Sequence, residues 1–183
     1  MGHRRHGPLR AILQFAIVGG VALATRASFA DQYTVPSGSM EPTILVGDRI
    51  VVNKAAYGLR VPLTHTWLAR FDEPRRGDVV VLQADTDDVL LKRVVAVGGD
   101  LVGVRDGHVW IDGARIDDPA VPPAPGGPDF GPAVVPHGKL LVLGDNRGNS
   151  RDGRTFGWVD RDAVIGRARA VILRDGHPSY TPL

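Results

Sequence analysis

Short apolar runs separated by turn residues constrain the fold of this 183-residue chain more than any other feature. One long run is Val89–Val97, which ends at Gly98-Gly99-Asp100, and Val79–Gln83 and Lys139–Leu143 are shorter runs of the same kind. Runs of this length that are rich in β-branched residues are typical of strands. The pattern therefore predicts many short strands and no long helix after residue 30.

The turns between these runs favour antiparallel hairpins. Leu101–Arg105 and His108–Ile111 are joined by Asp106-Gly107, and Asp112-Gly113 follows directly. Asp-Gly between two strand-like runs is a strong hairpin signal. Residues 117–136 are rich in Pro and Gly and predict a surface loop. The predicted fold class is mostly β, with an antiparallel sheet or a barrel-like core.

The N-terminus carries a different signal. Arg4, Arg5 and Arg10 flank the apolar stretch at residues 11–24, which only Gln14 interrupts. Counted from Pro8, the stretch has about seventeen residues, the short limit for a transmembrane helix. Because the basic flank comes first, residues 1–7 are expected in the cytoplasm, 8–24 in the membrane and 25–183 in an extracytoplasmic domain.

A cleaved secretory signal peptide fits the same N-terminal residues equally well. Its basic start, short apolar core and Ala22-Leu23-Ala24 follow that pattern. Both interpretations place the residues after about 30 outside the cytoplasm. A buried helix of a soluble domain fits less well, because arginines flank the segment.

Composition excludes several classes of function. The net charge is +2 with no basic block beyond the N-terminus, which argues against nucleic-acid binding. The chain has no Cys, so disulfides, a thiolate nucleophile and Cys-ligated zinc are excluded. The spacing of its six His fits no usual zinc pattern.

Ser37-Gly38-Ser39 is a candidate nucleophile segment. Pro36 and Pro42 stiffen it, and two residues that are two apart in an extended chain point to the same side. Ser39 is placed to attack a carbonyl while the Ser37 hydroxyl and a local N–H receive the oxyanion. Taken alone, an ordinary Ser/Gly turn is the commoner explanation of this pattern.

Lys92 supplies a candidate base. The chain has nineteen Arg and only three Lys, yet Lys92 lies inside the apolar run at residues 89–97. A desolvated lysine can lose its proton, whereas an arginine cannot. For Lys92 to act as a base near neutral pH, its pKa must lie roughly two to three pH units below the ordinary ~10.4 of a lysine. The alternative is a lysine at a strand edge whose amine reaches solvent.

A polar loop at residues 144–154 follows an apolar run, which suits hydrogen bonding to a catalytic centre. An ordinary polar turn with a local Asp–Arg pair would look similar. A Ser-His-Asp triad is a weaker alternative, because no motif surrounds the histidines at positions 65, 108, 137 and 177.

Together these segments resemble the type I signal peptidases, a family of membrane-anchored Ser–Lys endopeptidases. The matching segments, in order, are residues 35–43, 47–54, 76–81, 91–100 and 144–154. The short, proline-rich stretch at 112–137 is similar to compact Gram-positive-type members. Gly148 stands where the family usually has Asp and Gly153 where Ser is common, which implies altered loop rigidity rather than lost activity.

The resemblance implies roles for individual residues. Ser39 takes the position of the nucleophile, Lys92 that of the general base, and Ser37 that of an oxyanion-hole hydroxyl. Ser150 stands where a serine orients the lysine amine. A buried ion pair that supports the site is implied at Asp152 and Arg154. Met40 and Ile44 are candidates for facing the substrate or the lipid surface.

The implied activity is removal of signal peptides from exported preproteins, with cleavage after small residues in an Ala-x-Ala pattern. An acyl-enzyme forms on Ser39, and the substrate binds as an added strand. The implied partners are signal peptides and the lipid bilayer, with no metal, cofactor or nucleic acid. The resemblance also favours an uncleaved single-pass anchor.

Three alternatives stay open at this point. A self-cleaving repressor-type Ser–Lys protease has a similar fold, but it carries a DNA-binding domain where this chain has an apolar segment. A specialised processing peptidase would carry the same motifs. A catalytically silent, membrane-anchored domain that binds signal peptides is disfavoured by the joint presence of Ser39, Lys92 and Ser150.

Overall fold

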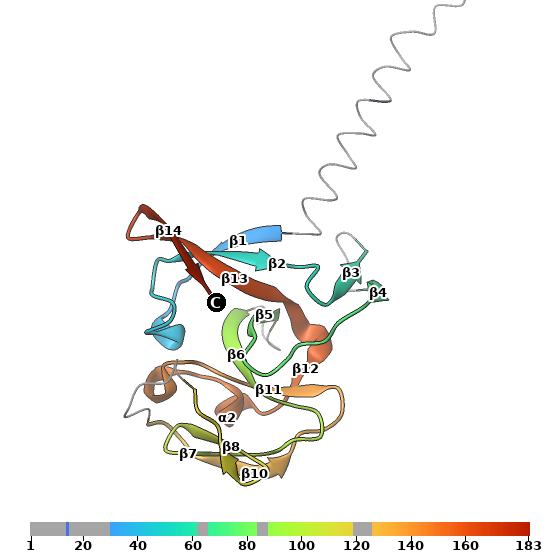
Figure 1. Cartoon of the computed structure of the whole chain (residues 1–183), viewed down its shortest axis with the longest axis vertical. Coiled ribbons are helices and arrows are strands. Elements are labelled where there is room, and N and C mark those ends of the chain that lie inside the picture. The colour runs from blue at the N-terminus through green and yellow to red at the C-terminus, as the bar shows by residue number, and fades with distance from the viewer. Residues whose placement is uncertain (1–13, 15–29, 62–65, 84–87, 119–125) are drawn as a thin grey trace, which may run out of the picture.

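The computed structural model describes residue 14 and residues 30–61, 66–83, 88–118 and 126–183 (Figure 1). This part of the chain is mostly antiparallel β, which confirms the predicted fold class. None of the helices in these ranges is long and apolar enough to cross a membrane. The anchor predicted at residues 8–24 lies outside the described residues except for Gln14.

The described residues form one large curled sheet. Its spatial order is β1 (Ala30–Thr34), β2 (Arg49–Asn53), β13 (Val164–Arg174), β5 (Val79–Gln83), β6 (Val89–Val97), β11 (Lys139–Leu143) and β12 (Val159–Asp160), and β14 (His177–Pro182) pairs with β13. All of these pairings are antiparallel. Figure 1 shows β1, β2 and β14 toward one end of the molecule, with β5, β6 and β11 nearer its middle.

Smaller elements complete the described fold. A second sheet has the order β10 (Phe130–Val134), β7 (Leu101–Arg105), β8 (His108–Ile111) and β9 (Ala114–Arg115), and β3 (Gly58–Arg60) pairs with β4 (Trp67–Arg70). The short helices are η1 (Gly38–Met40), η2 (Arg147–Asn149), α2 (Gly153–Phe156) and η3 (Arg161–Ala163). The second sheet lies at the opposite end of the molecule from β1 and β14 (Figure 1).

The predicted hairpins of the second sheet are confirmed. Asp106 and Gly107 have φ values of 48° and 74°, and Asp112 and Gly113 have 51° and 83°. Two consecutive residues with positive φ are what a type I′ turn requires, and this turn matches the twist of the strands it joins. The same dipeptide at residues 175–176 joins β13 to β14.

The prediction of one surface loop over residues 117–136 is wrong in part, because Phe130–Val134 forms β10. This strand pairs with the edge of β7 through Phe130 opposite Val104 and Ala133 opposite Val102. Pro132 interrupts the sequence pattern of a strand but is tolerated here, because β10 is an edge strand with a bulge. The phenyl ring of Phe130 also packs edge-on against Trp158, with ring centroids 5.2 Å apart.

Three buried clusters hold the elements together. One packs Met40 of η1 against the inner faces of β2, β5 and β13, and a second joins β6 and β11 to β7 and β8. The third lies on β5, β6 and β11 beside β12. Burial of β-branched and leucine side chains on this scale is the main stabilising term of the fold. The clusters therefore fix η1 and β6 relative to one another.

Candidate active site

Ser39 lies on the single turn η1, which connects β1 to β2. Its backbone is fixed from two sides, because the neighbouring Met40 is fully buried and Asn146 binds the turn. The N–H of Asn146 donates to Ser39 O at 3.1 Å, and its side-chain Nδ2 donates to Gly38 O at 3.0 Å. Two hydrogen bonds from Asn146 thus fix the backbone that positions the Ser39 hydroxyl.

Gly144 lets the loop after β11 lie close to the turn that carries Ser39. A Cβ at this position would lie 2.4 Å from Ser39 O and 2.2 Å from Ser150 Oγ, distances that real Cβ atoms do not show. Only a residue without a side chain fits between the nucleophile turn and the loop after β11. Gly144 was included in the predicted polar loop, but its role in packing could not be seen without the structure.

Lys92 lies in the middle of β6, opposite Val80 of β5. Its side chain is buried, with 3% exposure for the whole residue, and Nζ lies 2.8 Å from Ser39 Oγ. The structure therefore brings together the two residues that the sequence placed 53 positions apart. A hydroxyl and an amine at hydrogen-bond distance form the geometry of a nucleophile beside a base.

Burial lowers the pKa of Lys92 below its usual value, because an ammonium loses hydration in the apolar interior. The carboxylates of Asp152 and Asp145 act in the opposite direction, since nearby negative charge favours the protonated amine. The net direction is downward, so desolvation outweighs both carboxylates. A lysine with a lowered pKa holds its neutral, proton-accepting form at lower pH than an exposed lysine.

Asp152 and Arg154 form a fully buried ion pair next to this lysine. Arg154 donates from Nε to Asp152 Oδ1 and from Nη2 to Asp152 Oδ2, both at 2.9 Å. Asp152 also accepts from the backbone N–H of Gly144 at 3.0 Å and caps the N-terminus of α2 through the N–H of Arg154. The buried pair implied by the resemblance is therefore present, and it ties α2 to the end of β11.

A second buried pair joins the nucleophile segment to the strand of the lysine. Arg93 donates from Nε and Nη2 to the two oxygens of Asp145 at 2.9 and 2.7 Å, and Thr43 Oγ1 donates to Asp145 Oδ2 at 2.7 Å. Asp145 is 0% exposed. Sequence reasoning did not assign this role to Asp145, although a buried Arg beside the candidate base was a signal that a carboxylate had to be near.

The two supporting serines differ in position. Ser37 is exposed, and its Oγ lies 3.5 Å from Ser39 Oγ, so both hydroxyls are on the same side of the turn. Ser150 Oγ is buried and has no hydrogen-bond partner among the described residues. The structure therefore places Ser150 against Gly144 but does not join it to Lys92.

A groove of about 180 Å³ opens beside Ser39 and Lys92. It is lined by Tyr33, Thr34, Val35, Pro36, Ser37, Ser39, Met40, Ile50, Val81, Val89, Leu90, Leu91 and Lys92. These residues come from the end of β1, the nucleophile turn and the start of β6, with Ile50 and Val81 from β2 and β5. Ser39 and Lys92 thus lie at one wall of a small, mostly apolar groove.

Met40 and Ile44 were candidates for facing the substrate or the lipid surface, and their burial argues against the lipid surface. Both are 0% exposed and belong to the core cluster around β2, β5 and β13. Met40 still lines the groove, whereas Ile44 is not among its lining residues. Their apolar side chains in the nucleophile segment anchor that segment to the core, which is why they are buried.

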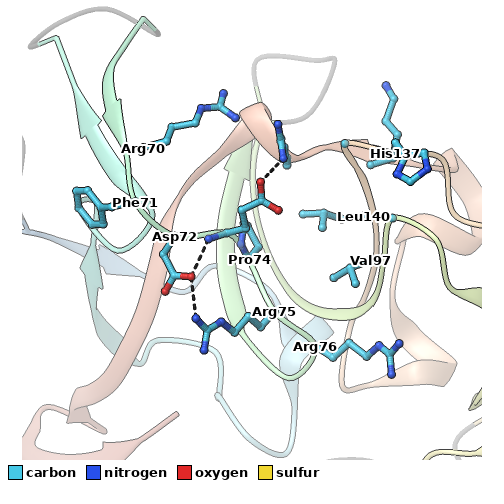
Figure 2. Close-up of a pocket in the computed structure, with 14 residues that line it drawn as sticks. Arg70, Phe71, Asp72, Pro74, Arg75, Arg76, Val97, His137 and Leu140 are labelled. Atoms are coloured by element: carbon cyan, nitrogen blue, oxygen red, sulfur yellow. Dashed lines mark hydrogen bonds and ion pairs between the residues drawn. The ribbon is translucent and has the colours of Figure 1, made fainter.

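A cavity of about 890 Å³ shares no lining residue with this groove. Figure 2 shows Phe71 and Asp72 on one side of it and His137 on the other, with Val97 and Leu140 between them. Its walls carry surface ion pairs such as Arg75–Asp72, at 2.9 Å. None of the predicted site residues lines it.

The weaker alternatives find no support in the described residues. No described histidine bonds to Ser39, and His108 contacts Arg115 instead. Within the same ranges no group of three His, Asp or Glu side chains is placed to hold a metal ion. His3, His6 and His65 lie outside the described residues.

Comparisons with known proteins identify relatives of this chain. A model of the family described as "Signal peptidase, peptidase S26" matches residues 9–173. "Probable signal peptidase I-2" of Synechocystis is 37% identical over 81% of this chain, and the match spans 65% of that relative. "Signal peptidase I" of Bacillus licheniformis is 34% identical over 84% of this chain and 82% of the relative.

A solved structure of a signal peptidase I from Enterococcus faecalis is also similar, with 27% identity. It overlaps 53% of this chain and 97% of that chain with a TM-score of 0.46. "Signal peptidase I" of Pseudomonas aeruginosa is 30% identical over 89% of this chain. The match of the family model over most of the sequence is decisive, and the chain therefore belongs to the signal peptidase family, peptidase S26.

Proposed function

We propose that this protein is a serine endopeptidase that removes signal peptides from exported preproteins, cutting after small residues of an Ala-x-Ala pattern. The observation that carries the proposal is the distance of 2.8 Å between Ser39 Oγ and the buried Nζ of Lys92. Membership of the family and the names of its relatives, which are signal peptidases, support the same activity.

The proposed reaction is acyl transfer through the Ser39–Lys92 pair. Neutral Lys92 accepts the hydroxyl proton while Ser39 Oγ attacks the scissile carbonyl, and the ammonium then protonates the leaving amine. This step leaves an ester between the signal peptide and Ser39. A water molecule, deprotonated by the same lysine, attacks the ester and regenerates the hydroxyl of Ser39.

The Ser37 hydroxyl and the N–H of Ser39 are the proposed oxyanion donors. Ser37 Oγ is 3.5 Å from Ser39 Oγ, and Ser37 is exposed and lines the groove. Ser150 is proposed to orient the lysine amine, and in support of this role its hydroxyl is buried and has no hydrogen-bond partner among the described residues. Asp152 and Arg154 support the site by holding the loop after β11.

The groove favours a preprotein segment with small side chains near the cut. Its volume of about 180 Å³ is well below that of drug-sized ligand pockets, which are ≈ 300–1,000 Å³. An extended segment lying between the end of β1 and the start of β6 would add a strand and point alternate side chains into the groove. This alternation accounts for small residues at the first and third positions before the cut.

Residues 8–24 are proposed as a single-pass anchor, with residues 1–7 in the cytoplasm and residues 25–183 forming the extracytoplasmic peptidase domain. The apolar stretch and its basic flank support this topology. The proposed partners are then the signal peptides of exported preproteins and the lipid bilayer. Extraction of membranes at alkaline pH tests the anchor, because an integral protein stays in the pellet.

Cleavage of a preprotein with an Ala-x-Ala site, assayed in detergent, tests the activity. The full-length chain should release the mature protein with its N-terminus at that site, and Ser39→Ala should release none. Absence of cleavage by folded wild-type protein would favour a silent signal-peptide-binding domain. Cleavage that survives Ser39→Ala would show that the nucleophile is another residue.

A further inference from the structure

Gly126 and Gly127, just before β10, reach the buried ion pair of the candidate active site. Arg154 Nη1 donates to Gly126 O at 3.3 Å, and Arg154 Nη2 donates to Arg147 O at 2.6 Å. The same guanidinium holds Asp152 through its Nε and Nη2. Arg154 is therefore held by one carboxylate and by two backbone carbonyls from different segments.

Gly127 fits this place only because it has no side chain. Its φ is +89°, and a Cβ would lie 2.4 Å from Arg154 Nη1 and 2.3 Å from Arg147 O. The first contact could be relieved by moving the guanidinium, but the second requires the backbone of η2 or the 126–127 turn to shift. At the neighbouring Gly126, by contrast, the nearest atom to a Cβ is Gly148 Cα at 3.9 Å.

The negative charge of Asp152, which Arg154 neutralises, raises the pKa of Lys92, the proposed base. Asp152 is the charged group that most strongly opposes the lowering of the Lys92 pKa, followed by Asp145. The Ser39 hydroxyl lies at hydrogen-bond distance from Lys92, and the charges that act on the lysine are Asp152, paired with Arg154, and Asp145, paired with Arg93. The other polar side chains that line the groove with it are those of Tyr33, Thr34 and Ser37. The residues that β5 places beside it, Val80 and Val81, carry no charge.

We propose that Gly127 is a positioning residue for the proposed reaction: its missing side chain lets the 126–127 turn close over Arg154, which keeps Asp152 neutralised and so helps Lys92 to shed its proton. The inference rests on the proposed Ser39–Lys92 function. It connects the Pro/Gly-rich segment before β10, which was expected to be a surface loop, to the chemistry at Lys92.

Gly127→Ala tests the proposal. The new methyl group displaces either the guanidinium or the turn, and both outcomes leave Asp152 less neutralised and admit water to the pair. Each change raises the pKa of Lys92, because negative charge and hydration both favour the ammonium. The acid limb of the pH profile of kcat/KM should move up by about half to one pH unit, with a plateau within about twofold of wild type.

Gly113→Ala is the matched control. Gly113 has a φ of +83°, so alanine meets the same backbone strain, but a Cβ there has nothing within 4 Å. The turn of Gly113 joins β8 to β9. This variant should lose only the stability that a side chain at positive φ costs, and it should keep the wild-type acid limb.

Titration of the lysines by NMR gives a readout that does not depend on cleavage. The chain has only three lysines, Lys54, Lys92 and Lys139, so a ¹³Cε-labelled sample of the full-length chain in detergent yields few signals. Lys92→Arg assigns the signal of Lys92. If wild-type protein cleaves nothing, the proposed function fails, yet the titration still shows whether Gly127→Ala raises the pKa of Lys92.

A Gly127→Ala variant with a lower plateau but an unmoved acid limb and an unmoved Lys92 titration would overturn the proposal, because it would show a purely structural role. If this variant does not fold, Arg154→Gln takes its place, since a neutral amide removes the charge that neutralises Asp152 and adds no fourth lysine signal. Its Lys92 titration should move in the same direction, and an unchanged titration would overturn the proposal.

Discussion

Replacing Asp145 by Asn should destabilise the protein strongly, because Asp145 bridges the nucleophile segment and the strand of the proposed base. Its carboxylate is 0% exposed and accepts two hydrogen bonds from Arg93 and one from Thr43. Removing one partner of a buried ion pair costs about 3–5 kcal/mol. We expect about 3 kcal/mol, because Arg93 keeps its bond to Gly77 O at 2.9 Å and its side chain is 14% exposed.

Thermal and denaturant unfolding of the two proteins measure this loss. For a chain of this size about 3 kcal/mol corresponds to a fall of about 6–12 °C in Tm. Asp160→Asn is the matched control, since the Lys139–Asp160 pair has the same charge types but side chains that are 35% and 64% exposed. Exposed pairs contribute at most about 1 kcal/mol. A loss for Asp145→Asn no larger than for Asp160→Asn would refute the bridging role.

The same variant has a predicted effect on pH dependence. Asp145 is the second carboxylate that raises the pKa of Lys92, so its replacement by a neutral amide should lower that pKa. Lys92 is proposed to act in its neutral form, and activity is therefore lost as the pH falls through its pKa. The acid limb of kcat/KM for Asp145→Asn should move to lower pH, which is opposite to the shift expected for Gly127→Ala.

Three further predictions concern single side chains. Lys92→Arg should lose cleavage of an Ala-x-Ala preprotein although the charge is kept, because an arginine does not give up its proton; measurable turnover would exclude the dyad. Gly153→Ser should lower stability by about 1–3 kcal/mol in chemical unfolding, although serine is common there in the family, because a Cβ would lie 2.7 Å from Leu141 Cδ1 and 2.9 Å from Val142 O. Alanine at the histidines of positions 65, 108, 137 and 177 should leave the cleavage rate within about twofold of wild type, and an inactive variant would indicate that a histidine is the general base.

The strands that sequence could predict are those whose apolar pattern is local. The run Val89–Val97 became β6 with the same bounds, and Lys139–Leu143 became β11. β1 was missed because Ala30–Thr34 is largely exposed and polar, and it exists through its pairing with β2. β10 was missed because its edge position, which tolerates Pro132, is a property of the sheet and not of the segment.

In the candidate site, too, the residues with a local sequence signal could be predicted, and those that depend on distant partners could not. Ser39 and Lys92 could be proposed from residue types and context, and their distance agrees with the proposal. Asp145 could not be given its role, because its partners Thr43 and Arg93 are 102 and 52 positions away. Met40 was a candidate for facing the substrate or the lipid surface, and it lines the groove while it packs in the core, a combination that only packing reveals.

The central claim is that Lys92 is a neutral base beside the Ser39 hydroxyl. The most direct test is to titrate Lys92 by NMR in the full-length chain and to compare its pKa with the acid limb of kcat/KM for preprotein cleavage. If Lys92 is the base, the two values coincide and lie below the ordinary value of 10.5 for a lysine. An active protein in which Lys92 titrates at the ordinary value, or in which the acid limb is unrelated to it, would show that Lys92 is not the base.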